Sequence, residues 1–442
     1  MLHFKKPPTT IAEIIPVWIP MALSWLMMGL EFPLITFALS YLADPKIHIA
    51  AAGGIALPIA MTIEAPVIAL LSASTALCVN KDALHKVFRY TMWIGGSLTA
   101  LHILISFEPF YGFVSEHLIA TPDELYDLTQ TALIVLIPWT WSIAIRRFYQ
   151  GVLIYTGKTR AIGAGTFVRL LAGTLACVAC ILLEKTFPEL INGSMMIGLA
   201  LSCGVVCEML YVVYYSRPIA ATLPDSHTAE TDKLSFNSFM KFYMPLAIGT
   251  IIWIMSRPVT AAAVTRMPDA INSLAVWAAA GSPLFIFRSF GVSLCELIIA
   301  LARYPESRPA IRRFTLWIGF YTTLGFLLFL ISPLARLWFE DISGLEPELA
   351  KQGVNSLWIC FCLPLSAALA NYYEGLNIAA GKTKNMTYGV IAMVLSLLIV
   401  LGYGVFTQSS SGLTIAMFSF LVGCIAQLTV VAIAAWNLPE SK

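Results

Sequence analysis

The sequence predicts an all-α polytopic membrane protein with twelve transmembrane helices, arranged as two parallel six-helix repeats. Three observations predict this fold: the composition, the spacing of the apolar stretches, and an internal repeat. Hydrophobic residues make up 58% of the 442 residues and charged residues only 12%, and the mean hydropathy is +0.80. A soluble domain carries roughly 25% charged residues. The composition therefore excludes a soluble enzyme and a disordered chain.

Twelve apolar stretches approach the ~20 residues that a helix needs to cross a bilayer. They lie at 15–41, 50–79, 90–107, 129–145, 161–183, 194–215, 242–265, 272–301, 314–335, 353–372, 386–406 and 412–436. The first is longer than the apolar core of a signal peptide and lacks a cleavage site of small residues, so we expect it to be retained. An even number of spans predicts that both termini lie on the same side.

The basic residues between these spans are distributed unevenly. Nineteen fall on the side of the termini, including Arg146 and Arg147 after the fourth span, and five fall on the opposite side. Loops on the cytoplasmic side of a membrane carry the excess of Lys and Arg. We therefore expect a multi-pass protein of the inner or plasma membrane with cytoplasmic N- and C-termini.

The chain repeats itself at an offset of 224 to 225 residues. Tyr149-Gln150-Gly151, followed by Gly157-Lys158-Thr159, recurs as Tyr373-Glu374-Gly375 followed by Gly381-Lys382-Thr383. Six helices in each half imply parallel repeats about an axis along the membrane normal. We predict an N-lobe at 1–215 with helices 1–6, a cytoplasmic linker at 216–237, and a C-lobe at 238–442 with helices 7–12. Such a linker lets the two lobes rock around a central midplane site.

The repeated loop resembles a phosphate-binding P-loop but differs from it in spacing. A P-loop has four residues between Gly and Gly-Lys-Ser/Thr and joins a strand to a helix, whereas five residues separate Gly151 from Gly157. The pattern favours a tight cytoplasmic turn, with Lys158 and Lys382 contacting the anionic headgroups of membrane lipid.

Seven charges fall inside the predicted spans: Glu31, Glu64, Arg169, Glu208, Arg257, Arg288 and Glu296. A charge at the centre of a membrane helix costs about 2.5–3.5 kcal/mol on insertion scales, so each needs a partner or a wet cavity. The repeat places Glu64 and Arg288 at equivalent positions and Glu31 next to the equivalent of Arg257. Two interpretations stay open: a midplane site with an acidic and a basic wall, or the ion pairs Glu64–Arg288 and Glu31–Arg257. In either case Glu31 or Glu64 is a candidate proton-coupling group.

The other three buried charges have weaker assignments. Arg169 either lines the cytoplasmic half of the path or reaches the interface. Glu208 has no partner evident in the sequence and is interpreted as an interhelical hydrogen-bonding group. Glu296 is expected to line the path near its cytoplasmic end or to reach the interface.

Helices one and seven contain prolines at matching places. Pro33 and Pro258 remove backbone hydrogen bonds, which is tolerated where the backbone lines a cavity, so both are candidate hinges. On helix seven Thr250, Trp253, Arg257 and Thr260 share one face. This polar and aromatic stripe is suited to an organic ligand.

Taken together, the six-plus-six helices, the proline-containing helices one and seven, and the Tyr-x-Gly…Gly-Lys-Thr loop resemble the multidrug/oligosaccharidyl-lipid/polysaccharide (MOP) exporter superfamily, with a MATE-like two-lobed fold. Met244-Pro245-Leu246-Ala247, Ser256-Arg257-Pro258 and Val264-Thr265-Arg266 are similar to a stretch of the progressive ankylosis protein group. That resemblance implies export of anions such as ATP, citrate or pyrophosphate, with Arg257 as the matched residue.

We therefore expect a secondary active transporter that exports a small organic anion by alternating access, with Arg257 and Arg288 binding its carboxylate or phosphate groups. The alternatives are a proton- or sodium-coupled exporter of drugs or organic cations bound by Glu31 and Glu64, and a flippase for lipid-linked precursors. No cluster of His, Asp or Ser predicts catalysis, so we expect no enzymatic activity and no catalytic residue. We also expect no metal, no cofactor and no nucleic-acid partner, H⁺ or Na⁺ as coupling ion, and a monomer.

Overall fold

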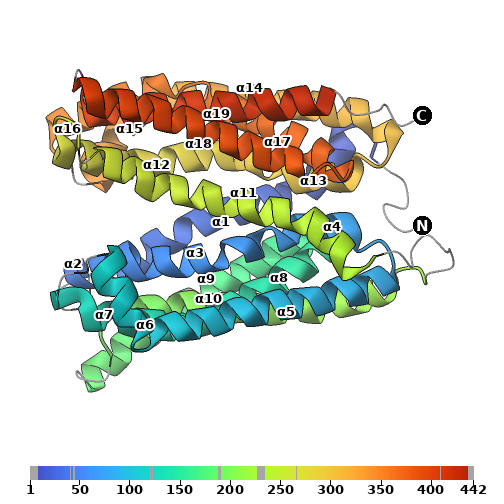
Figure 1. The fold of residues 1–442 in the computed structure, drawn as a ribbon, viewed down its shortest axis with the longest axis horizontal. Coiled ribbons are helices and arrows are strands. Elements are labelled where there is room, and N and C mark those ends of the chain that lie inside the picture. The colour runs from blue at the N-terminus through green and yellow to red at the C-terminus, as the bar shows by residue number, and fades with distance from the viewer. Residues whose placement is uncertain are drawn as a thin grey trace. The chain divides into compact units, whose positions relative to one another are not determined.

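The computed structural model of the protein describes residues 8–39, 41–42, 45–119, 121, 123–187, 191–225, 234–264, 266–343, 345–408 and 410–436. Within these ranges the regular structure is helical, and strands are absent (Figure 1). Ten helices are long and apolar enough to cross a membrane, and the number rises to twelve if two bent pairs each count as one span. The predicted all-α, polytopic fold class is confirmed.

The chain divides into two compact units. The first unit holds Ile19–Tyr243, and the second holds the described start of the chain up to Trp18 together with the chain from Met244 onward. Helices of the first unit are α1 (Ile11–Leu39, from Ile19), α2 (Pro45–His48), η1 (Ile49–Ala56), α3 (Leu57–Ile68), α4 (Leu70–Leu77), α5 (Lys81–Ser106), α6 (Phe110–Gly112), η2 (Phe113–Ile119), α7 (Asp123–Val135), α8 (Ile137–Tyr155), α9 (Arg160–Thr186) and α10 (Gly193–Ala221).

The second unit contains most of α11 and all later helices. These are α11 (Phe236–Val264), α12 (Ala270–Val292), α13 (Leu294–Leu301), η4 (Pro305–Ser307), α14 (Arg308–Ile331), α15 (Pro333–Leu337), η5 (Trp338–Ile342), α16 (Pro347–Ile359), α17 (Leu363–Ala379), α18 (Lys384–Thr407) and α19 (Gly412–Trp436). The expected linker at 216–237 is helical as far as Ala221, where α10 ends, and its residues 226–233 lie outside the described part.

The start of α1 is fixed within the second unit by Trp18. The indole Nε1 of Trp18 donates a hydrogen bond of 2.8 Å to the Ser293 hydroxyl. The same ring packs edge-on against Phe314, with 5.3 Å between the ring centroids. A buried indole needs such a hydrogen-bond acceptor for its N–H, which explains why this short segment packs with helices far along the chain.

The internal repeat is visible in the helix packing. In the first unit α8 packs against α3, α4, α5 and α10, and in the second unit α17 packs against α12, α13, α14 and α19. The pair α9 and α10 likewise corresponds to the pair α18 and α19. Two six-helix repeats with the same internal packing follow from the sequence repeat.

Equivalent glycines allow the closest helix contacts. A Cβ on Gly151 would lie 2.9 Å from the carbonyl oxygen of Leu71, and a Cβ on Gly375 would lie 2.9 Å from that of Cys295. Small residues let membrane helices approach to backbone contact, which is their main source of packing energy in lipid. The sequence repeat thus preserves a place where only glycine fits.

The Gly-Lys-Thr loops are helix-terminating turns. Gly157 and Gly381 both have φ of 72°, a conformation that glycine adopts without steric cost. The Lys158 amide bonds to the Leu153 carbonyl at 2.8 Å, and the Lys382 amide bonds to the Asn377 carbonyl at 2.8 Å. This is the Schellman pattern of a helix C-terminus, and it joins two helices, so the predicted tight turn is confirmed in both units.

The contact at Gly375 predicts a position-specific loss of stability. Gly375→Ala forces a methyl group into the α13 backbone, so we expect a loss of about 1–3 kcal/mol, as for overpacked cores. The control is Gly402→Ala in α18, since a Cβ at Gly402 meets nothing within 4 Å. Thermal unfolding of the purified protein in detergent measures both variants. Equal melting temperatures for the two would contradict the predicted close contact.

Candidate functional site

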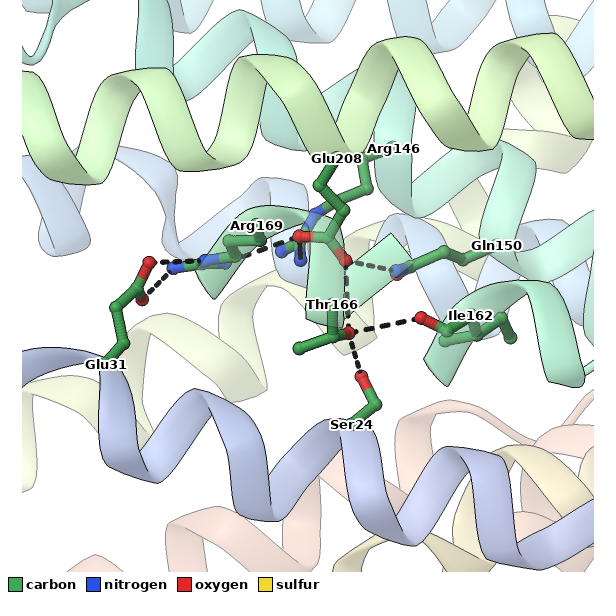
Figure 2. Close-up of polar contacts among 8 residues, drawn as sticks. All are labelled: Ser24, Glu31, Arg146, Gln150, Ile162, Thr166, Arg169 and Glu208. Carbon is green, nitrogen blue, oxygen red and sulfur yellow. Dashed lines mark hydrogen bonds and ion pairs between the residues drawn. The ribbon is translucent and has the colours of Figure 1, made fainter. Parts of the chain in front are cut away.

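A buried polar cluster occupies the interior of the first unit. Its members are Ser24, Glu31, Arg146, Gln150, Thr166, Arg169 and Glu208, and all seven are at most 7% exposed. We call this set the Glu208 cluster (Figure 2). The side chains come from α1, α8, α9 and α10, which are separate in sequence.

Helical spacing directs these side chains inward. Arg146 and Gln150 are four residues apart on α8, and Thr166 and Arg169 are three residues apart on α9. Residues three or four apart lie on the same face of a helix. Each helix therefore presents two neighbouring polar groups toward Glu208 of α10.

Glu208 accepts contacts from three directions. Its Oε2 lies 2.6 Å from Arg146 Nη1 and 3.7 Å from Arg169 Nη1. Its Oε1 accepts hydrogen bonds from Gln150 Nε2 at 3.2 Å and from the Thr166 hydroxyl at 3.3 Å. Both carboxylate oxygens are therefore engaged, as a fully buried carboxylate requires.

Arg169 connects Glu208 to α1. Its Nε donates to Glu31 Oε1 at 2.7 Å, and its Nη2 donates to Glu31 Oε2. The two parallel bonds form the bidentate geometry that arginine makes with carboxylates. The Ser24 and Thr166 hydroxyls, 2.5 Å apart, form a second connection between α1 and α9.

The cluster balances its own charge. Glu31 and Glu208 supply two negative charges and Arg146 and Arg169 supply two positive ones. Buried ion pairs persist only with good geometry and additional hydrogen bonds, because both ions lose their hydration. Removing one partner would leave an uncompensated charge.

Close packing of α10 against α9 brings Glu208 into place. Gly204 precedes Glu208 by one helical turn, and a Cβ on Gly204 would lie 2.9 Å from the Arg169 carbonyl oxygen. The same Cβ would lie 3.5 Å from Glu31 Oε1. Glycine at this position therefore makes room for both the helix contact and the ion pair.

Glu64 and Arg147 extend the charged region. Glu64 is 4% exposed, and its Oε2 has no hydrogen-bond partner in the described part of the chain. The charges of Arg146, Arg147 and Arg169 act on it. The Arg147 guanidinium lies over the Trp25 ring, 5.8 Å from its centroid.

The second unit contains two arginines without comparable neutralisation. Arg288 in α12 lies over the ring of Phe420 at 4.9 Å, and its Nη2 approaches the Cys424 sulfur at 3.8 Å. Its Nε is buried and has no hydrogen-bond partner among the described residues. Arg257 is exposed, lies over the Trp253 ring at 5.8 Å, and is acted on by the charge of Arg288. Within the described residues of the unit, neither has a carboxylate at ion-pair distance.

The other predicted residues of helix seven make local contacts. The Thr250 hydroxyl bonds to the Leu246 carbonyl at 3.0 Å, and the buried Thr260 hydroxyl bonds to the Ser256 carbonyl at 2.9 Å. Both hydroxyls keep lone pairs for a ligand but spend their proton on their own helix. The two candidate hinges, Pro33 and Pro258, lie within α1 and α11, which continue through them to Leu39 and Val264.

A buried acid in the second unit was not among the predicted site residues. Glu374 in α17 is 5% exposed, and its Oε1 accepts a hydrogen bond of 2.6 Å from Gln427 Nε2 in α19. Glu296, a predicted residue, is 8% exposed in the first turn of α13. A break at Ser293 separates Glu296 from α12, so it does not continue the helix of Arg288.

Three sequence expectations need correction. Arg146 and Arg147 are not loop residues, because α8 continues to Tyr155 and buries both at 2% and 7% exposure. Glu208 does have partners, since Arg146 and Arg169 flank it. Glu31 pairs with Arg169, a different partner from the Arg257 that the repeat suggested. The signal that would have revealed the first error is Gly157, which marks the true end of this helix.

The fold is similar to solved structures of membrane transporters. A MOP superfamily transporter from Pyrococcus furiosus superposes with a TM-score of 0.76 at 13% identity, covering 99% of this chain and 100% of that one. A MATE transporter of Vibrio cholerae gives 0.73 at 17%, covering 98% and 97%. An outward-facing multidrug resistance MATE family transporter gives 0.74 at 13%, covering 98% and 96%. No family model and no curated protein matches the sequence.

The chain therefore has the fold of the MATE and other MOP superfamily transporters, as the sequence predicted. Identities of 13–17% establish a shared fold, and the cargo has to be inferred from the side chains. The many apolar helices and this fold define a multi-pass membrane protein. The more specific resemblance to the progressive ankylosis group stays a prediction.

The Glu208 cluster predicts a large penalty for losing its central carboxylate. Glu208→Leu leaves Arg146 and Arg169 with one carboxylate between them, and breaking a buried ion pair costs about 3–5 kcal/mol. Thermal unfolding in detergent is the measurement. Arg336→Ala is the control, because its ion pair with Glu340 is surface-exposed and exposed pairs contribute about 0–1 kcal/mol. A Glu208→Leu protein as stable as the control would show that the cluster is dispensable.

Proposed function

We propose that the protein is a secondary active transporter that exports a small organic anion, such as a citrate-, ATP- or pyrophosphate-like molecule, by rocking-lobe alternating access. The single observation that carries this proposal is the state of Arg257 and Arg288. They lie on α11 and α12 of one unit, each influences the other electrostatically, and neither has a carboxylate at ion-pair distance in the described part of that unit.

The contrast with the first unit strengthens this proposal. There Arg146 and Arg169 are neutralised by Glu208 and Glu31. Intramembrane arginines are costly and mark ion or substrate pathways when they lack a protein partner. An anionic ligand would relieve the repulsion between Arg257 and Arg288 and satisfy the buried Nε of Arg288.

The chemistry of these side chains favours a carboxylate or phosphate ligand. A guanidinium presents a planar fork of donors that matches both groups. Trp253 lies against Arg257, and a cation over an aromatic face is held in orientation by the ring. Thr250 and Thr260 on the same helix offer hydroxyl lone pairs that complete the proposed binding face with Trp253.

Coupling is assigned to a proton at Glu64 in preference to Glu31. Both oxygens of Glu31 are bound by Arg169, so proton uptake there would break a bidentate pair. Glu64 has a buried Oε2 without a hydrogen-bond partner among the described residues. A proton on that oxygen breaks no hydrogen bond that the described structure contains.

The alternative is a proton- or sodium-coupled exporter of drugs or organic cations. The buried acid Glu64 favours it, as does the likeness to a multidrug resistance MATE family transporter. Yet the Pyrococcus furiosus transporter is described as having a binding pocket of reverse polarity that suggests a different function. The same fold therefore accommodates different pocket polarities. A lipid-linked precursor flippase is the third candidate, and cytoplasmic termini complete the proposed topology.

The anion proposal predicts the effect of removing each arginine. With the protein in proteoliposomes, we expect Arg257→Ala and Arg288→Ala each to reduce citrate or ATP flux at least about tenfold, because a charged hydrogen bond contributes about 1.5–3 kcal/mol. Glu64→Gln is expected to abolish the dependence of flux on a proton gradient.

The controls separate the candidate functions. Arg336→Ala, an exposed arginine paired with Glu340, should transport at the wild-type rate. A cationic dye and a lipid-linked sugar tested in the same vesicles identify the alternatives if they move and the anions do not. Anion flux that survives loss of both arginines would overturn the assignment of the site.

A further inference from the structure

The two units contain the same buried side-chain pair with the residue types exchanged. Gln150 of α8 and Glu374 of α17 are equivalent at an offset of 224 residues. Gly193 and Gly412 begin α10 and α19, and Glu208 and Gln427 each follow fifteen residues later. The offset at this last helix is therefore 219 residues.

The contacts within the two pairs are equivalent. In the first unit Gln150 Nε2 donates to Glu208 Oε1 at 3.2 Å, and in the second Gln427 Nε2 donates to Glu374 Oε1 at 2.6 Å. The glutamine and the glutamate have exchanged helices while the amide-to-carboxyl contact has been kept. Glu374 and Glu208 are thus alternative solutions for one position in the repeat.

The arginines around Glu208 have no counterpart around Glu374. The position of Arg146, four residues before Gln150, is taken by Ala370, and the position of Arg169 is taken by Met393. The glycine contacts confirm the second equivalence. A Cβ on Gly204 would approach the Arg169 carbonyl oxygen at 2.9 Å, and one on Gly423 would approach the Met393 carbonyl oxygen at 3.0 Å.

Glu374 is therefore a buried carboxyl group without an ion-pair partner within the described residues of its unit. It is 5% exposed, as deeply placed as many core side chains. An isolated carboxylate removed from water is strongly disfavoured and takes up a proton instead. The Gln427 N–H bonds to Oε1, which is the acceptor that a neutral carboxyl group retains, while Oε2 is left to carry the hydrogen.

The charges on the surrounding helices point the same way. Glu296 of α13 and Arg288 of α12 both act on Glu374, so two carboxyl groups share one arginine, and one proton balances the set. The Cys295 thiol of α13 and the Cys424 thiol of α19 also interact with it. Helix α14 contributes Arg308 and Arg312, which act on the adjacent Tyr372, and α18 contributes the uncharged Asn385, bonded to Asn377.

We propose that Glu374, held by Gln427, is a proton-binding site of the second unit. A proton is favoured over a metal cation because the amide presents an N–H to the carboxyl group. In addition, the described residues contain no group of three His, Cys, Asp or Glu side chains placed to hold a metal ion. The site is independent of the cargo and of Glu64, so it stands or falls separately from the proposed function.

Infrared difference spectroscopy of the purified full-length protein tests the proposal. A protonated carboxyl group has a carbonyl stretch distinct from that of a carboxylate. In a Glu64→Gln background we expect such a band at neutral pH, and we expect Glu374→Gln to remove it. Glu208→Gln is the matched control and should leave the band in place, because Arg146 and Arg169 keep Glu208 ionised.

Exchange of the pair provides a second, more specific test. Adding Gln427→Glu to Glu374→Gln restores the pair in the order of the first unit but without its arginines, so the protonated band should return. Ala370→Arg should remove the band by supplying the missing guanidinium. A band that persists in Glu374→Gln, or that sodium ions abolish at constant pH, would overturn the assignment of a proton to Glu374.

Discussion

The ion pair between Arg146 and Glu208 is the interaction on which the first unit depends. A charge inside a lipid-surrounded bundle has no water to turn to, so four helices must converge for either residue to be tolerated. Arg169 and Glu31 extend this pair to α1, and Gln150 and Thr166 complete the hydrogen bonds. The order of α1, α8, α9 and α10 around Glu208 is thereby specified by polar contacts as well as by apolar packing.

The two units share a backbone arrangement but not a distribution of charge. Glycines at equivalent positions, such as Gly204 and Gly423, keep the same helix contacts in both. The side chains around them have diverged, with a neutralised cluster in one unit and exposed or partnerless arginines in the other. Conserved geometry with altered polarity is how one repeat can contribute structure while the other contributes ligand chemistry.

The helices, the repeat and the Gly-Lys-Thr turns could be predicted from the sequence, because each leaves a signal of length, periodicity or glycine placement. The Glu208 cluster could not. The predicted fourth and tenth spans stopped at 145 and 372, because average hydropathy falls where Arg146 and Glu374 begin the polar part of the helix. The pairing of Glu208 with the position of Gln427 was hidden by the five-residue change in offset before α19. Ion-pair partners depend on which helices pack together, and hydropathy says nothing about that.

The sequence order of the Glu208 cluster has a consequence for biosynthesis. A chain emerges from the ribosome N-terminus first, so α8 with Arg146 enters the bilayer before α10 with Glu208 has been made. During that interval the arginine has no carboxylate from α10. Its helix must wait near the insertion machinery or at the membrane surface, and final burial of Arg146 follows the arrival of the sixth span. Assembly of this unit is therefore a late, concerted step rather than a helix-by-helix addition.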